Sequence, residues 1–368
     1  MTRFNGGVRS AASVRADSEG SLLVSIKEVA HRAGVSVGTV SNVLNRPGNV
    51  NEDTLQRVRT AISELGYVRN ESARQLRAGQ SRTIGLVVLD VANPFFTDLA
   101  RGVESLAHDA DMVVTLCNSD NDGGRQARHL DVLAQQRVRG VLITPLDTHA
   151  PSIQHLVDHG IPVVLVDRGS EDATRCSVSV DDVHGGRLAG AHLAGEGHDR
   201  IAFVGGPFDI RQVSDRLEGL REGAPDADVQ VVEVNGLSVA DGREAARHVI
   251  DMPVDRRPTA VLCANDLIAL GMLQEVVRAG LRVPQDLALV GYDDIDFAAA
   301  AVVPLSSVRQ PREQLGRAAA ELLLEEAGDA AGQHIHRQVV FRPELVVRTS
   351  SGGPDGFGTE TVTGEGTA

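Results

Sequence analysis

From Thr83 onward, short runs of β-branched and other apolar residues alternate with segments of helical periodicity. Continuous apolar runs of this kind are typical of parallel strands covered on both faces and joined by right-handed βαβ crossovers. The chain has 368 residues, which is too long for one ordinary core. The runs predict a doubly wound α/β body of two similar lobes, with a ligand cleft at the strand ends. They are TIGLVVLD, MVVTLC, GVLITP, PVVLVD, RIAFVGG, VQVVEV, AVLCA and LALVGYDD.

Three short helices are predicted ahead of this body, between Ser25 and Gly66. Ser25 and Glu28 have the spacing of a capping box, Ser36 and Asn51 are placed as N-caps, and Gly34 and Gly66 as left-handed ends. The predicted inner faces are Val29, Ala30 and Ala33, then Val40, Val43 and Leu44, then Leu55, Val58, Ile62 and Leu65. Only Gly34-Val35 separates the first two helices, the tight turn of a helix-turn-helix. A generic three-helix bundle is the plainer alternative.

The helical head and the body differ in charge. The net charge is −14, but residues 21–82 hold nine Lys or Arg against five Asp or Glu. A small basic head on an acidic body is expected when only the head meets phosphate groups.

Several other classes lack support. Cys117, Cys176 and Cys263 form no CxxC pair, which predicts neither a disulfide framework nor a zinc finger and favours a reducing cytoplasm. No apolar signal segment follows the first arginines, which argues against export and against a free-standing periplasmic sugar-binding protein.

Enzyme and metal signatures are also missing. HGGRLAG has the wrong glycine spacing for a dinucleotide site, and the only lysine, Lys27, is in the first helix, so no P-loop can form. His155 and His159 have a metal-binding spacing, but a solvated helix face is the simpler interpretation. We expect no catalytic site, metal or cofactor.

The motifs SIKEVAHRAGVSVGTVSNVLN, LGYVRNESARQLRAGQSRTIGLVV, DVANPFF and VGYDDI…PLSSVRQP resemble those of the LacI/GalR (lactose repressor) family. The resemblance extends from about Ser25 to Arg348. It implies a helix-turn-helix head joined to a periplasmic-binding-protein-like body, and a homodimeric, cytoplasmic, nucleoid-associated repressor that binds pseudo-palindromic operator DNA.

The resemblance places the second helix in the major groove. Val37, Gly38 and Asn42 match base-reading positions, and Gly38 departs from the larger side chain common there. The phosphate-contacting or neighbouring positions it implies are Ser36, Thr39, Ser41, Asn45, Tyr67 and Asn70. Plain solvation of a helix surface is the alternative for the short polar residues.

Residues 69–82 resemble the family's hinge helix. Leu76 would be the wedge between base pairs, and Ala73 would face the floor of the minor groove. The alternative is an exposed leucine in a flexible linker.

In the body, the resemblance implies nine effector-contacting positions. They are Phe95, Phe96, Asn118, Arg168, Asp182, Arg216, Asn265, Asp266 and Asp293. Carboxylates and arginines around an aromatic ring suit a polyhydroxylated ligand, so we expect a sugar or sugar derivative. A purine or nucleoside is the alternative: Ile210 replaces an arginine of purine-responsive members, although Arg211 beside it could substitute.

We predict these boundaries: a disordered arm (1–20), the helix-turn-helix domain (21–68), the hinge (69–82), the effector and dimerisation domain (83–349) and a disordered tail (350–368). The N-lobe is expected at 83–181 and 309–337, and the C-lobe at 182–308 and 338–349. The tail has no leucine heptad, which favours a dimer over a tetramer. Both induction and co-repression by the effector occur in the family, and the residues do not indicate which of the two applies to this chain.

Overall fold

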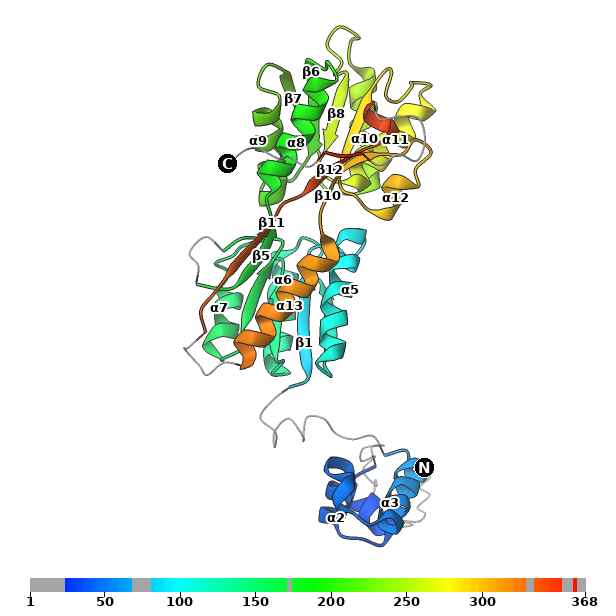
Figure 1. The fold of residues 1–368 in the computed structure, drawn as a ribbon, viewed down its shortest axis with the longest axis vertical. Coiled ribbons are helices and arrows are strands. Elements are labelled where there is room, and N and C mark those ends of the chain that lie inside the picture. The colour runs from blue at the N-terminus through cyan, green and yellow to red at the C-terminus, as the bar shows by residue number, and fades with distance from the viewer. Residues whose placement is uncertain (1–23, 68–80, 171–173, 329–333, 353–359, 363–368) are drawn as a thin grey trace, which may run out of the picture. The chain divides into compact units, whose positions relative to one another are not determined.

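The computed structural model describes residues 24–67, 81–170, 174–328, 334–352 and 360–362. The chain forms two compact units, 1–79 and 80–368 (Figure 1). The predicted arm and most of the predicted hinge, including Asn70, Ala73 and Leu76, lie outside the described residues.

The described residues of the first unit form three α-helices whose predicted caps are confirmed. They are α1 (Ile26–Ala33), α2 (Val37–Asn45) and α3 (Glu52–Leu65), with a short 3₁₀ helix, η1 (Pro47–Asn49), between the last two. Ser25 and Glu28 form the capping box. Gly34 and Gly66 end α1 and α3 at φ values of 64° and 62°, a left-handed conformation that glycine adopts at little cost.

The core of this unit is small and made of short side chains. It consists of Val29, Ala30, Ala33, Val40, Val43, Leu55, Val58 and Ala61. Leu44, Ile62 and Leu65, which the periodicity assigns to the inner faces, pack at its edge and are only partly buried. Three short helices bury too little surface to cover every apolar residue.

The N-lobe of the second unit is built on a six-stranded parallel sheet with the order β11-β5-β4-β3-β1-β2. The strands are β1 (Thr83–Val88), β2 (Val113–Asn118), β3 (Gly140–Ile143), β4 (Val163–Val166), β5 (Ser177–Val180) and β11 (Gln338–Phe341). Its helices are α5 (Pro94–Asp109), α6 (Gly123–Gln135), α7 (Pro151–Asp158) and α13 (Arg312–Gly328).

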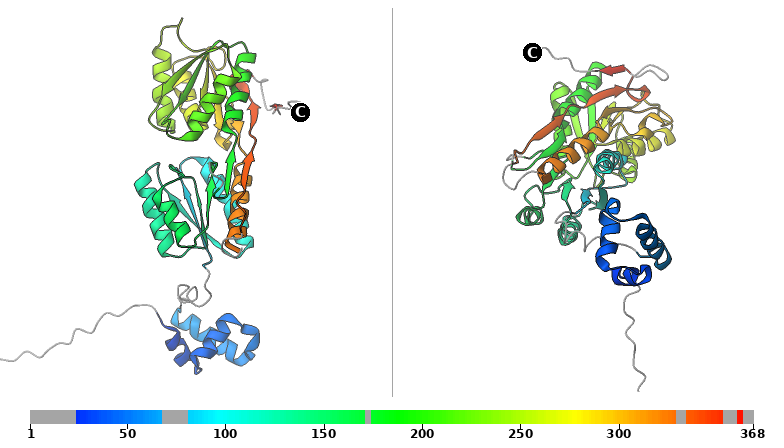
Figure 2. Two further views of the ribbon diagram at one scale, coloured as in Figure 1. Left: turned by 90° about the vertical axis from the view of Figure 1, so that its left-hand side faces the viewer. Right: turned by 60° about the horizontal axis from the view of Figure 1, so that its bottom comes forward.

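Helices cover both faces of this sheet, as Figure 2 shows in its left view. In β4, Val164 and Val166 face the core shared with α5 and α13, whereas Val163 and Leu165 face the core shared with α6 and α7. Side chains alternate between the faces of a strand, so a strand covered on both sides is apolar throughout. The predicted apolar runs have this physical origin.

The C-lobe has a seven-stranded sheet with the order β13-β12-β10-β9-β8-β6-β7. Its strands are β6 (Arg200–Gly205), β7 (Asp228–Glu233), β8 (Ala260–Cys263), β9 (Ala288–Asp293), β10 (Ser306–Arg309), β12 (Glu344–Val347) and β13 (Glu360–Val362). Near one edge, β12 is antiparallel to both of its neighbours, β10 and β13, and the other pairs are parallel. The helices are α8 (Asp182–Gly195), α9 (Arg211–Gly223), α10 (Val239–Asp251), α11 (Asp266–Arg278) and α12 (Asp296–Ala299), with the 3₁₀ helix η2 (Thr349–Ser351).

Close contact between α8 and α9 explains the glycines of HGGRLAG. A Cβ atom on Gly186 would lie 2.2 Å from the carbonyl oxygen of Arg216, and one on Gly190 would lie 2.6 Å from that of Leu220. These glycines allow two helix backbones to approach each other, which agrees with rejecting a dinucleotide motif.

The chain passes between the lobes after β5, after β10 and after β11 (Figure 1). The expected lobe boundary at Gln338 is wrong, because residues 338–341 form β11 and pair with β5 in the N-lobe sheet. The last crossing therefore comes after Phe341.

The predicted start of the tail at Ser350 is also wrong. Ser350 and Ser351 are buried, and the Ser350 hydroxyl donates to the Leu289 carbonyl at 2.6 Å. A polar segment can be ordered when its polar groups find partners inside the fold. Residues 360–362 add a further strand beside β12.

No helix among the described residues is both long enough and apolar enough to cross a membrane.

Candidate DNA-binding face and effector cavity

The predicted recognition helix α2 presents a polar outer face. Val37, Gly38, Asn42 and Asn45 are exposed, whereas Val40 and Val43 are in the core. Val37 is 41% exposed. The outer face of α2 is therefore accessible within this unit, and Asn45 on that face is also bonded to Ser41.

Other predicted DNA contacts also have local roles. The Ser36 hydroxyl accepts from the Thr39 amide at 3.0 Å and caps α2, while the Asn45 amide donates to the Ser41 carbonyl at 2.8 Å. Tyr67 packs against the edge of the small core. These bonds fix the start and the end of α2 without covering its outer face.

A cavity of about 220 Å³ lies between the lobes, at the carboxyl ends of their strands. Its walls come from the N-lobe, the C-lobe and the second crossing. The lining residues are Leu89, Asp90, Asn93, Phe95, Phe96, Asn121, Asp167, Ile210, Gln212, Val213, Arg216, Gly236, Leu237, Ser238, Asp241, Asn265, Asp293 and Gln310. This is the position at which doubly wound folds bind ligands.

Arg216 is the centre of a buried charged network beside the cavity. Its Nε donates to Asp182 Oδ1 at 2.8 Å, and its Nη1 donates to the Ala264 carbonyl at 2.6 Å. Its guanidinium carbon lies 3.7 Å from the centre of the Tyr292 ring, a cation–π contact. Asp182, an expected effector contact, is therefore the partner that neutralises Arg216, and it does not line the cavity.

Asp293 is held from both lobes. Asn93 donates to its Oδ2 at 3.1 Å and Gln310 donates to its Oδ1 at 2.7 Å. Its backbone has a φ of 105°, a conformation that non-glycine residues rarely adopt. Burial raises the pKa of Asp293, and Arg216 opposes that rise. This backbone conformation and the hydrogen bonds from Asn93 and Gln310 hold the Asp293 carboxylate at the cavity wall.

Asp167 supplies an unsatisfied acceptor. Gln212 donates to its Oδ2 at 2.9 Å, while its Oδ1 is buried and has no hydrogen-bond partner among the described residues. Burial, followed by the nearby charge of Asp182, raises the pKa of Asp167 to about 8. Gln310 Oε1 is a second buried acceptor in the wall without a partner in the described part of the chain. Buried acceptors of this kind call for a donor, which a bound ligand can supply.

The structure brings together five of the nine expected effector positions at the cavity: Phe95, Phe96, Arg216, Asn265 and Asp293. The two phenylalanine rings meet edge to face, with centroids 5.0 Å apart. Contact of these residues with an effector stays a prediction.

The other four expected positions do not line it. Asn118 accepts from the Val91 amide at 3.2 Å and supports the loop after β1. Asp266 accepts from the Ser307 hydroxyl at 2.6 Å and the Ile295 amide at 2.8 Å. Arg168 and Asp182 lie on an adjoining hollow, which shares Asp167 and Gln212 with the cavity.

The sequence interpretation missed several lining residues, notably Asp90, Asn93, Asp167, Gln212 and Gln310. Asp90 and Asp167 each follow an apolar strand run, and that position was a usable signal. Gln212 and Gln310 had no local signal, because their role depends on the carboxylates they meet.

Both apolar and polar side chains at the start of α9 line the cavity. Ile210 and Val213 are the apolar ones, and Gln212 and Arg216 are the polar ones. Arg211 pairs with Asp215 at 2.6 Å and lies on the adjoining hollow.

Two family models match different parts of the chain. The model of bacterial regulatory proteins of the lacI family matches residues 25–70, and that of the periplasmic binding protein-like domain matches residues 191–351. The ribose operon repressor of Escherichia coli (strain K12) is 36% identical over 307 residues, which are 82% of this chain and 92% of the relative. The chain belongs to the LacI family of bacterial regulatory proteins.

Other LacI-family relatives and structures agree. The HTH-type transcriptional repressor PurR of Aliivibrio fischeri (strain MJ11) is 33% identical over 333 residues, covering 89% of this chain and 98% of the relative. The lac repressor dimer bound to operator and the anti-inducer ONPF has a TM-score of 0.76 at 27% identity, covering 89% and 99% of the two chains. A LacI family regulator from Enterococcus faecium with bound ribose has a TM-score of 0.66 at 28% identity, covering 73% and 98%.

As a LacI-family member, the chain is a DNA-binding transcriptional repressor that responds to a small-molecule effector. The relatives are transcriptional repressors, which are not enzymes.

Proposed function

We propose that the cavity binds an uncharged monosaccharide or a close derivative, and that this ligand controls operator affinity. The observation that most supports this proposal is the pair of buried acceptors in the cavity wall, Asp167 Oδ1 and Gln310 Oε1. Hydroxyl groups are donors that suit such acceptors, and a polyol offers several of them. The cavity of about 220 Å³ is smaller than the roughly 300–1,000 Å³ of drug-sized sites.

The charge of the lining favours an uncharged ligand. Among the described lining residues, four are aspartates (Asp90, Asp167, Asp241 and Asp293) and the cation is Arg216, which is already bonded to Asp182. Asp167 favours its protonated form, but a phosphate or carboxylate would still meet the other three lining carboxylates, and Arg216 is already paired with Asp182. Sugar phosphates and sugar acids are therefore disfavoured. The ribose-bound relative supports the same class.

A purine base is the second candidate, favoured by the identity to PurR. The apolar wall at Ile210 argues against it, because Arg211 is paired elsewhere. We rank the sugar first for this reason.

The effector is coupled to DNA through the two lobes. A ligand that touches Asn93 and Asp293 acts on groups from both lobes, so it biases their relative position. By reciprocity, operator binding must change effector affinity by the same factor. The proposal includes a homodimer that reads a pseudo-palindrome in the cytoplasm, with residues 69–82 as the hinge and Leu76 as its wedge.

The test is a thermal-shift screen of the full chain with ribose, other monosaccharides, disaccharides, ribose 5-phosphate and hypoxanthine. A ligand at a hundred times its dissociation constant stabilises the folded state by about 2.7 kcal/mol. A neutral sugar should raise the melting temperature, and operator titration with that sugar then reveals whether it induces or co-represses. Stabilisation by hypoxanthine alone would replace the sugar with the purine.

A further inference from the structure

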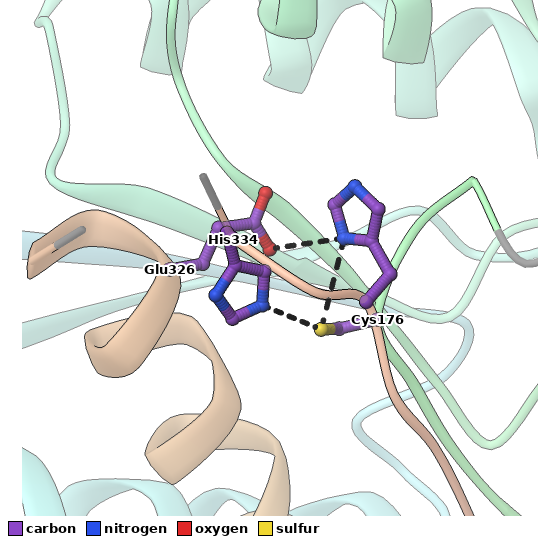
Figure 3. Close-up of side chains that lie close together, drawn as sticks. Cys176, Glu326 and His334 are labelled. Atoms are coloured by element: carbon purple, nitrogen blue, oxygen red, sulfur yellow. Dashed lines mark hydrogen bonds and ion pairs between the residues drawn. The ribbon is translucent and has the colours of Figure 1, made fainter. Parts of the chain in front are cut away.

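A cluster of potential metal ligands lies in the N-lobe, away from the cavity lining. Cys176, Glu326, His334 and His336 each offer one ligand atom, and these atoms lie within 4.8 Å of one another. We call this set the Cys-His cluster. Figure 3 shows Cys176, Glu326 and His334 close together. None of the four belongs to the effector cavity, and the function proposed above uses none of them.

Three segments bring the Cys-His cluster together. Cys176 comes directly before β5, Glu326 is in the last turn of α13, and the two histidines lead into β11. β5 and β11 are parallel neighbours in which Ser177 is opposite Gln338, so the residues ahead of both strands also lie side by side. The pairing of two strands thus creates the site.

The alternation of an extended chain places both histidines on one side. His334 and His336 are two residues apart, and side chains of residues i and i+2 share a face. Ile335 between them is 81% exposed, which is consistent with the opposite direction. The sequence HIHR carries this signal.

Three separations between ligand atoms of the cluster lie within a few tenths of an ångström of those around a tetrahedral ion. Cys176 Sγ lies 3.2 Å from His334 Nε2 and 3.9 Å from His336 Nδ1, and His336 Nδ1 lies 3.9 Å from Glu326 Oε2. Bond lengths of about 2.3 Å for zinc to sulfur and about 2.0–2.2 Å to nitrogen or oxygen place ligand atoms about 3.4–3.6 Å apart in a tetrahedron. The observed distances lie on both sides of this value.

We propose that the Cys-His cluster binds one Zn²⁺ ion. A thiolate and two imidazoles suit zinc rather than Mg²⁺ or Ca²⁺, which prefer oxygen ligands, and a carboxylate completes four-coordination. The Arg337 amide donates to Cys176 Sγ at 3.4 Å, a contact that also stabilises a thiolate. The ion joins the end of α13 to the starts of β5 and β11.

Burial also suits a structural ion. Cys176 has no exposed surface and belongs to the core that includes α5 and α13, while the side chains of Glu326 and His336 are 17% and 30% exposed. The sulfur is therefore shielded, and the imidazole and carboxylate side remains open for entry of the ion. The expectation of no metal came from counting cysteines and one histidine pair.

The experiment uses untagged full-length protein, treated with EDTA and then given ZnCl₂ or CoCl₂. We expect one equivalent of Co²⁺ to give the intense d–d bands of a tetrahedral ion and a thiolate-to-cobalt charge-transfer band, and zinc to displace it. Zinc should also raise the melting temperature, because it binds the folded state.

Variants separate this site from other cysteines and histidines. Cys176→Ser should abolish the charge-transfer band, and His334→Gln, which leaves the core cysteine in place, should weaken cobalt binding at least tenfold. The matched controls are Cys117→Ser and the double variant His155→Gln/His159→Gln, whose histidine rings lie 4.2 Å apart outside the cluster. Both controls should keep the full spectrum. Absence of the charge-transfer band in the unmodified chain, or its loss in either control but not in His334→Gln, would overturn the zinc site.

Discussion

Asn93 and Asp293 are 200 residues apart in the chain, and a hydrogen bond of 3.1 Å joins them across the cavity. Asn93 belongs to the N-lobe, where its side-chain oxygen also accepts from the Phe95 amide at 3.0 Å and caps α5. Asp293 ends the C-lobe strand β9. The Asn93 side chain thus caps α5 in the N-lobe and also donates to the Asp293 carboxylate of the C-lobe.

Asn93→Asp keeps the helix cap but replaces the donor with a second carboxylate opposite Asp293. Aspartate is as good an N-cap as asparagine, so the stability of α5 should change little. Repulsion between the two carboxylates should weaken effector binding about tenfold, or about 1.4 kcal/mol, as measured by calorimetry. Asn93→Ser, which keeps a cap without the charge, should show a smaller loss. Equal losses in the two variants would argue against charge as the cause.

Asp167→Asn should stabilise the protein and weaken effector binding. The folded-state pKa of Asp167 is raised to about 8, so the folded form favours the protonated acid. This contribution to stability is present below the unfolded pKa of about 4 and is lost as pH rises towards 8. The variant has no charge to bury, so its melting temperature should exceed that of the unmodified chain at pH 8, with a difference that shrinks towards pH 5. A constant difference across that range would show that Asp167 does not titrate in it.

Arg216→Met should destabilise the C-lobe strongly. The guanidinium is 7% exposed and neutralises Asp182, and removal of one partner from a buried pair costs about 3–5 kcal/mol. Urea denaturation measures the loss. Arg211→Ala on the same helix removes a 57% exposed partner of Asp215 and should cost under about 1 kcal/mol. Adding Asp182→Asn to Arg216→Met should restore part of the stability; no recovery would mean that the charge of Asp182 is not the cause.

Asn42→Ala should reduce specific operator binding by about 1–3 kcal/mol, because an asparagine on the outer face of α2 can bond a base edge. Fluorescence anisotropy with operator and with unrelated DNA measures the two affinities. Thr60→Ala, on the exposed surface of α3, is the control and should leave both unchanged. A parallel fall on both DNAs for Asn42→Ala would indicate a phosphate contact.

Leu76→Ala tests the hinge, which lies outside the described residues. A wedge between base pairs contributes at specific sites, where the DNA is bent, and not to general attraction for phosphate. Specific operator affinity should therefore fall far more than affinity for unrelated DNA in the same titration. Equal falls would identify Leu76 as an ordinary linker residue.

Local rules determined much of this protein from the sequence. All eight strands predicted from apolar runs are present. The inner strands are apolar because both of their faces are covered, whereas β2 and β7 are edge strands that expose several side chains. The N-caps of α1, α2 and α3 follow from single side chains that accept from the amide three residues later. Such signals are complete within a short window, and the tertiary structure did not change them.

The tertiary structure decided which segments meet. β5 and β10 escaped prediction because buried positions in both are serines, such as Ser177, whose hydroxyl accepts from the Ser170 amide, and Ser307, which donates to Asp266. A buried serine is stable only when a distant partner satisfies it, and no local pattern reveals that partner. The same holds for Asn93 and Asp293, which come from the two lobes and meet only at the cavity between them. It also holds for Cys176 and His334, which are adjacent only after β5 and β11 have paired.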